Sequence, residues 1–87
     1  MFMNENINDT ILKEVQQLFR QAMGNDVNVD INTEKDMIAE WDSINHLNLI
    51  VELESAFDLG LSMEEIEKLH SVRQIVAVIQ SKNGNAT

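Results

Sequence analysis

The side chains best suited to chemistry in this sequence are a serine and a histidine three positions apart, Ser43 and His46. On a helix this spacing brings the two side chains to the same face. A Ser–His nucleophile also needs an acid that orients the imidazole and an oxyanion hole. The sequence offers no glycine-rich turn or strand-to-helix elbow for these, so a hydrolase is the weakest hypothesis. We expect no catalytic residue and interpret His46 as a packing or surface residue.

A second set of polar side chains has the spacing of a calcium-binding loop, with oxygen atoms at alternate positions. The set is Asp26, Asn28, Asp30, Asn32 and Glu34. The sixth position, which needs a glycine for the sharp turn, is Ile31, and the twelfth, which needs a bidentate glutamate, is Met37. His70 likewise has no partner at ligand spacing. The sequence therefore predicts no metal site.

Composition narrows the remaining classes of protein. The chain has 87 residues, which predicts one small domain. It contains no cysteine and no proline, so disulfide scaffolds and thiolate metal sites are excluded and nothing forces a break in a helix. A net charge of −9 disfavours nucleic acid and anionic membrane surfaces as partners. The sequence has no apolar run long enough for a membrane span, and its acidic N-terminus does not resemble a signal peptide, so we expect a cytoplasmic protein. We also expect a monomer.

The negative charge is concentrated in the middle of the chain. No lysine or arginine lies between Lys35 and Lys68. That segment holds nine acids: Asp36, Glu40, Asp42, Glu52, Glu54, Asp58, Glu64, Glu65 and Glu67. These acidic residues form either a solvated face or a surface that steers basic partners toward the protein.

The apolar pattern predicts an all-α fold, a small four-helix bundle with three main helices and one short helix. The predicted helices cover residues 10–23, residues 43 or 44 to 58, a short stretch from Ser62, and a stretch from Ser71 onward. Asn8, Asp9 and Thr10 are candidate N-caps of the first helix, Gly24 is its stop, and the region of Gly60 ends the second. Ser62 and Ser71 each begin a capping-box pattern. The tail from residue 81 is expected to fray.

A long loop is expected between the first two main helices. Val27, Val29 and Ile31 alternate with polar residues, as in a strand, yet a lone strand would have no partner. We therefore expect residues 25–41 to cross the bundle as a loop that buries these aliphatic side chains, with one helical turn near residues 33–36. A loop of this length in a small domain usually serves a function.

The second helix has a broad apolar face and two aliphatic residues outside it. The predicted core face consists of Leu47, Leu49, Ile50, Leu53, Ala56 and Phe57. Ile44 and Val51 lie on or beside the polar side and are nearly aligned, because they are seven residues apart. With Asn48 and Glu52 beside them, we expect Ile44 and Val51 to contact a partner protein.

These residues resemble the acyl carrier protein family over about residues 8–80. The resemblance is carried by Glu40-Trp41-Asp42-Ser43-Ile44, by Leu47, Leu49, Ile50, Glu52, Leu53, Glu54 and Phe57-Asp58-Leu59, by residues 62–69, and by Ser71-Val72 with Ile75, Val76 and Ile79. The family's hallmark is Asp-Ser-Leu at the start of the second of four helices. The resemblance implies a single carrier-protein domain over residues 1–87, ordered over about residues 8–80.

The resemblance also implies a cofactor and partners. It makes Ser43 the attachment site of 4′-phosphopantetheine and Asp42 its companion, although Ser43 is equally suited to be an N-cap. The positive end of the helix dipole suits a phosphodiester there, and the thiol of the arm would hold the cargo as a thioester. Expected partners are a phosphopantetheinyl transferase and acyl-loading and acyl-using enzymes with basic docking patches.

Four positions differ from the carriers of fatty acid synthesis. Asn45 and Asn48 stand where those carriers are often acidic, and Trp41 and His46 are also unlike them. These differences indicate a stand-alone carrier for a specialised pathway, with polyketide, aminoacyl or modified acyl cargo. The alternative from another class is an acidic helical regulatory module that binds a basic or amphipathic partner without being modified.

Overall fold

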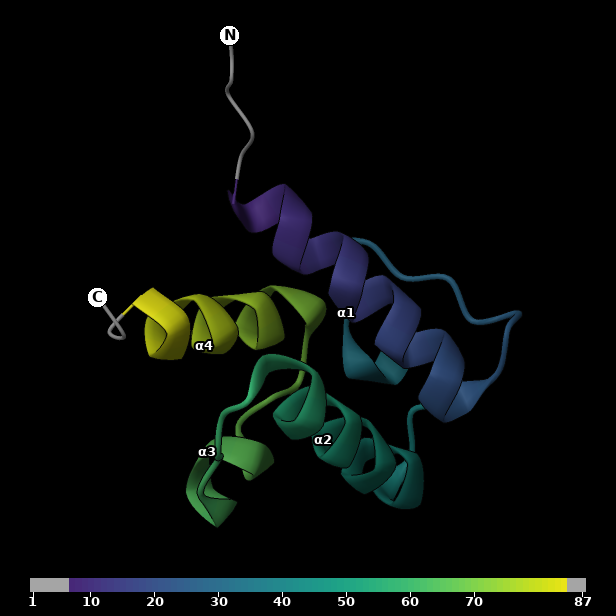
Figure 1. Cartoon of the computed structure of the whole chain (residues 1–87). Helices are drawn as coiled ribbons and strands as arrows, with labels where there is room; N and C mark the ends of the chain where they lie inside the picture. The colour runs from purple at the N-terminus through teal and green to yellow at the C-terminus, as the bar shows by residue number, and fades with distance from the viewer. Residues whose placement is uncertain (1–6, 85–87) are drawn as a thin grey trace, which may run out of the picture.

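The computed structural model describes residues 7–84 and has the predicted all-α architecture. Its elements are α1 (Ile7–Met23), the 3₁₀ turn η1 (Lys35–Met37), α2 (Ser43–Phe57), α3 (Met63–Glu67) and α4 (Val72–Gly84). The longest helix, α1, packs closely against both α2 and α4, whereas α3 has no comparably close helix partner (Figure 1). Within residues 7–84, no helix combines the length and hydropathy that a membrane span requires.

One hydrophobic core joins α1, α2, α4 and the long loop. Its buried side chains are Ile11, Val15, Leu18 and Phe19 of α1; Val27, Val29 and Trp41 of the loop; Leu49, Ile50 and Leu53 of α2; Leu69; and Val72, Ile75, Val76 and Ile79 of α4. The buried residues of the first and last helices follow the three- and four-residue spacing seen in the sequence. The core therefore holds both ends of the loop and the start of α2 in place.

The first helix starts earlier than predicted. It begins at Ile7, so Asn8, Asp9 and Thr10 lie inside α1 and none of them is its N-cap. Its end is as predicted: Gly24 has a φ of 119°, and its N–H donates to the carbonyl of Arg20 at 2.9 Å. Glycine tolerates that left-handed conformation because it has no Cβ.

The later helices follow the predicted order with different ends. Helix α2 ends at Phe57, and its left-handed C-cap is Asp58, with a φ of 53°, which lies in the predicted region two residues before Gly60. Ser62 caps α3 in a capping box with Glu65, as predicted. The Ser71 hydroxyl accepts from the N–H of Gln74 at 3.1 Å. Helix α4 continues to Gly84, beyond the predicted end of order near residue 80, and residues 85–87 lie outside the described range.

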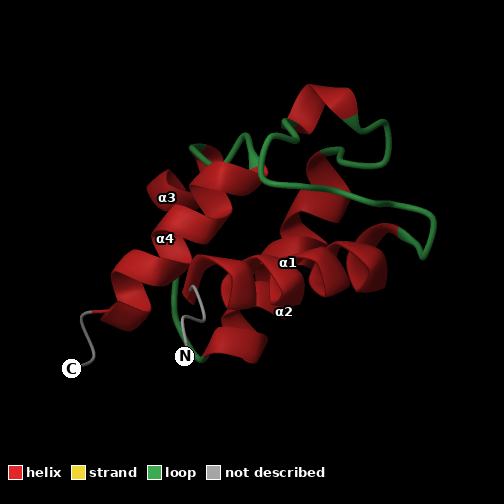
Figure 2. Ribbon diagram, turned by 90° about the horizontal axis from the view of Figure 1, so that it is seen from above, coloured by secondary structure: helices red, strands yellow, loops and turns green. Residues whose placement is uncertain are grey.

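The loop of residues 24–42 runs along the bundle, as the long green segment of Figure 2 shows. Val27 and Val29 are buried and their polar neighbours are exposed, so the alternation is real although the segment is not a strand. The side-chain amide of Gln16 donates to the carbonyl of Val29 at 2.8 Å. The predicted helical turn is η1, two residues later than expected. Just before it, a single β-bridge joins Glu34 to Ser71.

The predicted core face of α2 is too wide. Leu49, Ile50 and Leu53 are buried and Phe57 is half-buried, but Leu47 is 53 % exposed and Ala56 is exposed. The reason is the position of α3, which stands away from the first turns of α2 and leaves Leu47 beside an open cleft.

Candidate functional site

Ser43 is the first residue of α2, and its side chain is exposed. The helix is capped by the residue before it: Asp42 Oδ1 accepts a hydrogen bond from the N–H of Asn45 at 2.9 Å. The alternative prediction that Ser43 is the N-cap is therefore wrong. Among the described residues, none shares a hydrogen bond with the Ser43 hydroxyl. The Ser43 hydroxyl is therefore exposed to solvent and is not required to cap the helix.

His46 lies one turn further along α2 and is only 8 % exposed, so of the two predicted roles it has the packing role. The indole N–H of Trp41 donates to His46 Nδ1 at 2.8 Å, and His46 Nε2 lies 3.0 Å from the carbonyl oxygen of Ile66. Both ring nitrogens are occupied, so neither is available to take a proton from Ser43. The two side chains do not form a nucleophile–base pair.

Trp41 links this histidine to the core. Its ring is buried and meets the ring of Phe19 edge-on, with centroids 4.8 Å apart and planes at 81°. Its plane and that of the His46 imidazole are nearly parallel, at 25°, and the ring centroids are 6.1 Å apart. The segment just before Ser43 is therefore anchored to α1, which gives the serine a fixed position at the rim of the bundle.

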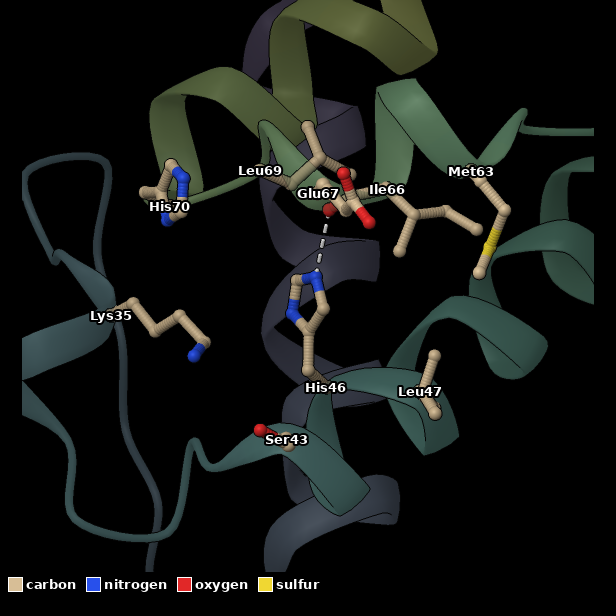
Figure 3. Close-up of a pocket in the computed structure, with 9 residues that line it drawn as sticks. All are labelled: Lys35, Ser43, His46, Leu47, Met63, Ile66, Glu67, Leu69 and His70. Atoms are coloured by element: carbon tan, nitrogen blue, oxygen red, sulfur yellow. Dashed lines mark hydrogen bonds between the residues drawn. The ribbon is translucent and has the colours of Figure 1, made fainter.

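A cleft of about 270 Å³ opens directly beside Ser43, between α2, α3 and η1 (Figure 3). Its lining residues are Lys35, Ser43, His46, Leu47, Met63, Ile66, Glu67, Leu69 and His70. In Figure 3, Lys35 and His70 lie on one side of the cleft, and Leu47 and Met63 lie on the other. The cleft combines an apolar wall with a serine hydroxyl at its edge.

The sequence analysis did not identify most of this lining. Met63 and Ile66, three residues apart on α3, form an apolar stripe that could have indicated a wall facing α2. The contribution of Lys35 and His70 depends on the loop path, since the backbone N–H of Lys35 donates to the carbonyl of His70 at 2.7 Å. Only the folded chain brings these two residues together.

The short helix α3 is held by its polar ends. The pKa of Glu65 is below its usual value because the backbone N–H of Ser62 donates to its carboxylate, and because Lys82 of α4 lies beside it. The Lys82 ammonium is 3.2 Å from the Glu65 carboxylate. Before α3, the N–H of Leu61 donates to the carboxylate of Glu54 at 2.9 Å.

The predicted partner-binding residues lie on an accessible part of α2. Ile44 is 73 % exposed and Val51 is 64 % exposed, Asn48 is exposed, and Glu52 is half-buried. Leu47, which was assigned to the core, adds a third exposed aliphatic side chain between Ile44 and Val51. The first three turns of α2 thus present an apolar row near Ser43.

The calcium-like spacing in the loop has a structural role. Asp30 Oδ1 accepts from the N–H of Asn32 at 2.8 Å and from the Thr33 hydroxyl at 3.3 Å, closing a turn before the β-bridge. Asn32 accepts a hydrogen bond from Arg73 at 2.8 Å. In the described part of the chain, no three potential metal ligands gather at one place.

Comparison with known proteins finds a matching family and several similar proteins. Residues 13–79 match the family described as "Phosphopantetheine attachment site". The chain is 33 % identical over 76 residues to the acyl carrier protein of an Exiguobacterium species, which covers 85 % of this chain and 95 % of the relative. It is 43 % identical over 42 residues to the acyl carrier protein of Buchnera aphidicola, covering 48 % and 52 % of the two chains.

The fold is similar to that of a solved relative. The solution NMR structure of a holo acyl carrier protein from Geobacter metallireducens superposes with a TM-score of 0.77 at 27 % identity. The match covers 87 % of this chain and 88 % of that one. Sequence and structure therefore point to the same family.

Proposed function

Since the chain belongs to the acyl carrier protein family, we propose that Ser43 is the residue that bears its 4′-phosphopantetheine arm. A carrier of this family holds acyl intermediates for other enzymes and is not itself an enzyme. The observation that carries the assignment is the exposed Ser43 hydroxyl at the first position of α2. This hydroxyl is not needed as a cap, because Asp42 caps the helix.

The surroundings of Ser43 fit a phosphodiester. The unpaired backbone N–H groups and the dipole of a helix N-terminus favour an anion at this position. In attachment the Ser43 oxygen forms a bond to the phosphopantetheinyl phosphorus of coenzyme A, the pyrophosphate P–O bond breaks, and adenosine 3′,5′-bisphosphate leaves while the hydroxyl proton is released. The arm supplies the thiol that this cysteine-free chain lacks. Asp42 holds the first turn of the helix, so Ser43 is presented in one orientation.

The cleft beside Ser43 supports the sheltering of an acyl chain. Its apolar wall comes from Leu47, Met63, Ile66 and Leu69, and its mouth includes the attachment serine. An alkyl chain that leaves water for such a wall gains about 0.8 kcal/mol per buried methylene group. We propose that short and medium acyl chains fold back from the arm into this cleft.

The surface of α2 is the proposed docking site for the transferase and for the acyl-loading and acyl-using enzymes. The exposed aliphatic row of Ile44, Leu47 and Val51 can be desolvated, while Glu52 and the acids around it attract basic patches on a partner. Steering by charge raises the association rate and weakens with salt, whereas apolar contact lowers the dissociation rate.

A specialised pathway is favoured by the uncharged start of α2. The Asn45 amide donates to the carbonyl of Glu40 at 2.8 Å, and the Asn48 amide donates to Asn45 Oδ1 at 3.2 Å. These two residues thus form a neutral hydrogen-bonded row where fatty-acid carriers often present acids. We propose that partners of this carrier recognise that neutral row.

The test is the intact mass of the purified chain after incubation with coenzyme A and a phosphopantetheinyl transferase. Wild type and Ser55→Ala, an exposed serine on the same helix, are expected to gain one arm, and Ser43→Ala none. Gain of the arm by Ser43→Ala would overturn the assignment of Ser43. No gain by wild type with several transferases would favour the second candidate, an unmodified acidic module that binds a basic partner.

A further inference from the structure

Helix α3 forms one wall of the cleft but has few attachments to the rest of the protein. None of its five residues is fully buried, although half-buried Ile66 packs against the core. Glu65 ties the helix to α4 through a half-exposed ion pair with Lys82, a type of contact that contributes little to stability. The inner face is tied to α2 by the hydrogen bond between His46 and the carbonyl of Ile66.

The partners of His46 determine its protonation. The Trp41 indole N–H is only a donor, so His46 Nδ1 must accept, and the Ile66 carbonyl is only an acceptor, so Nε2 must carry the hydrogen. The imidazole is therefore neutral, with its hydrogen on Nε2. An imidazolium would point a second N–H at the indole N–H of Trp41, and that contact would become repulsive.

We infer that His46 is a positioning residue for cargo binding: as a neutral imidazole it fastens α3 to the start of α2 and so fixes the width of the cleft beside Ser43. The inference rests on the proposed function, because the cleft matters only if Ser43 carries an acyl arm. Trp41, His46 and the Ile66 carbonyl form a continuous link from the core to α3, and this link is defined here as the Trp41–His46–Ile66 bridge.

Charged groups of both signs lie around the bridge. Lys35 of η1 and Glu67 of α3 line the same cleft with opposite charges, and His70 lies on the connection between α3 and α4. Asp42 lies one turn before His46 and receives the N–H of His46 on its backbone carbonyl at 2.8 Å. On the α1 side, the bridge meets the uncharged ring of Phe19 through Trp41.

The bridge consequently depends on both ring nitrogens of His46. A side chain that cannot accept from Trp41 or donate to the Ile66 carbonyl breaks it, and α3 then loses its fixed distance from α2. Because Trp41 is the one tryptophan in the sequence, its fluorescence reports the bridge directly.

The first experiment uses the full chain without the arm and compares variants at one neutral pH. We measure Trp41 fluorescence and the hydrogen-exchange protection of the α3 amides, corrected for intrinsic exchange rates. His46→Leu, which keeps the bulk of the side chain without the hydrogen bonds, is expected to lose roughly fivefold protection in α3, as for one lost hydrogen bond, with a parallel change in fluorescence. His46→Gln, whose side-chain amide can still donate to Ile66, is expected to show neither change.

The matched control is His70→Gln, which removes the other histidine of the cleft and is expected to keep the α3 protection and the Trp41 fluorescence of wild type. Wild-type α3 protection in His46→Leu would overturn the inference, as would an equal loss of protection in His46→Leu and His70→Gln.

The second experiment measures cargo. Butyryl, octanoyl and dodecanoyl arms are loaded on wild type, His46→Gln and His46→Leu, and the melting temperature of each is compared with its unacylated form. Wild type and His46→Gln are expected to favour the same chain length, and His46→Leu is expected to lose that preference. One chain-length profile for all three proteins would refute cargo positioning, whereas failure of every protein to accept an arm would refute the proposed function instead.

Discussion

Two adjacent residues at the start of α2 should have different roles. Replacing Asp42 should lower the stability of the fold, and replacing Ser43 should prevent attachment of the arm. Asp42 accepts the N–H of Asn45 and caps the helix, while the Ser43 hydroxyl is exposed and uncommitted. Replacement of a capping aspartate by alanine costs about 0.5–2 kcal/mol, typically about 1 kcal/mol. In a domain of this size, 1 kcal/mol lowers the melting temperature by about 4–8 °C.

Ser43→Ala removes no cap, so its effect should stay within about 0.5 kcal/mol, the range of ordinary surface substitutions. The assay is thermal unfolding followed by circular dichroism for Asp42→Ala, Asp42→Asn and Ser43→Ala, all without the arm. Asparagine caps about as well as aspartate, so Asp42→Asn should keep nearly the stability of wild type. A larger loss for Ser43→Ala than for Asp42→Ala would refute our description of this helix start.

Three further predictions follow from other parts of the molecule. Ile44→Ala and Val51→Ala should slow modification by the transferase at every salt concentration, whereas Glu52→Gln should slow it mainly at low salt; unchanged rates for both aliphatic variants would place docking elsewhere. Titration calorimetry should detect no tight stoichiometric calcium site, because Asp30 already accepts two hydrogen bonds within its own turn; a stoichiometric isotherm lost in Asp30→Ala would contradict this. The carboxylate of Glu65 stabilises the fold above its unfolded pKa, and that contribution is lost as pH falls below 4.5 through its lowered folded pKa; melting temperatures from pH 6 to 3 should therefore fall less steeply for Glu65→Gln, and parallel curves would contradict the shift.

The helices could be predicted because their apolar residues repeat at helical spacing and their stop signals are local. Val15, Leu18 and Phe19 lie on one face of α1 in any helix, and Gly24 ends it through its own backbone freedom. The alternation of Val27 and Val29 also predicted correctly that a loop buries them. Ser43 could be proposed from the residues around it, since Asp-Ser followed by periodic leucines is a local pattern that resembles the family.

The number of α2 side chains that are buried could not be predicted, because it depends on how α3 is placed. Leu47 has the spacing of a core residue but lines the cleft between α2 and α3. The pairing of Trp41 with His46 was also missed, although only five positions separate them. Their hydrogen bond requires the turn before α2 to fold back over the helix start, and Ile66 enters from twenty residues away.

The most direct test of the central claim is fragmentation mass spectrometry of the loaded chain, which locates the added group on a single residue. Wild-type protein is incubated with coenzyme A and a phosphopantetheinyl transferase and then fragmented without prior digestion. Our account predicts that every fragment containing Ser43 carries the mass of one phosphopantetheine arm and that fragments lacking it carry none. An arm located on Ser55, Ser62, Ser71 or Ser81 would contradict the account, as would a chain that remains unmodified.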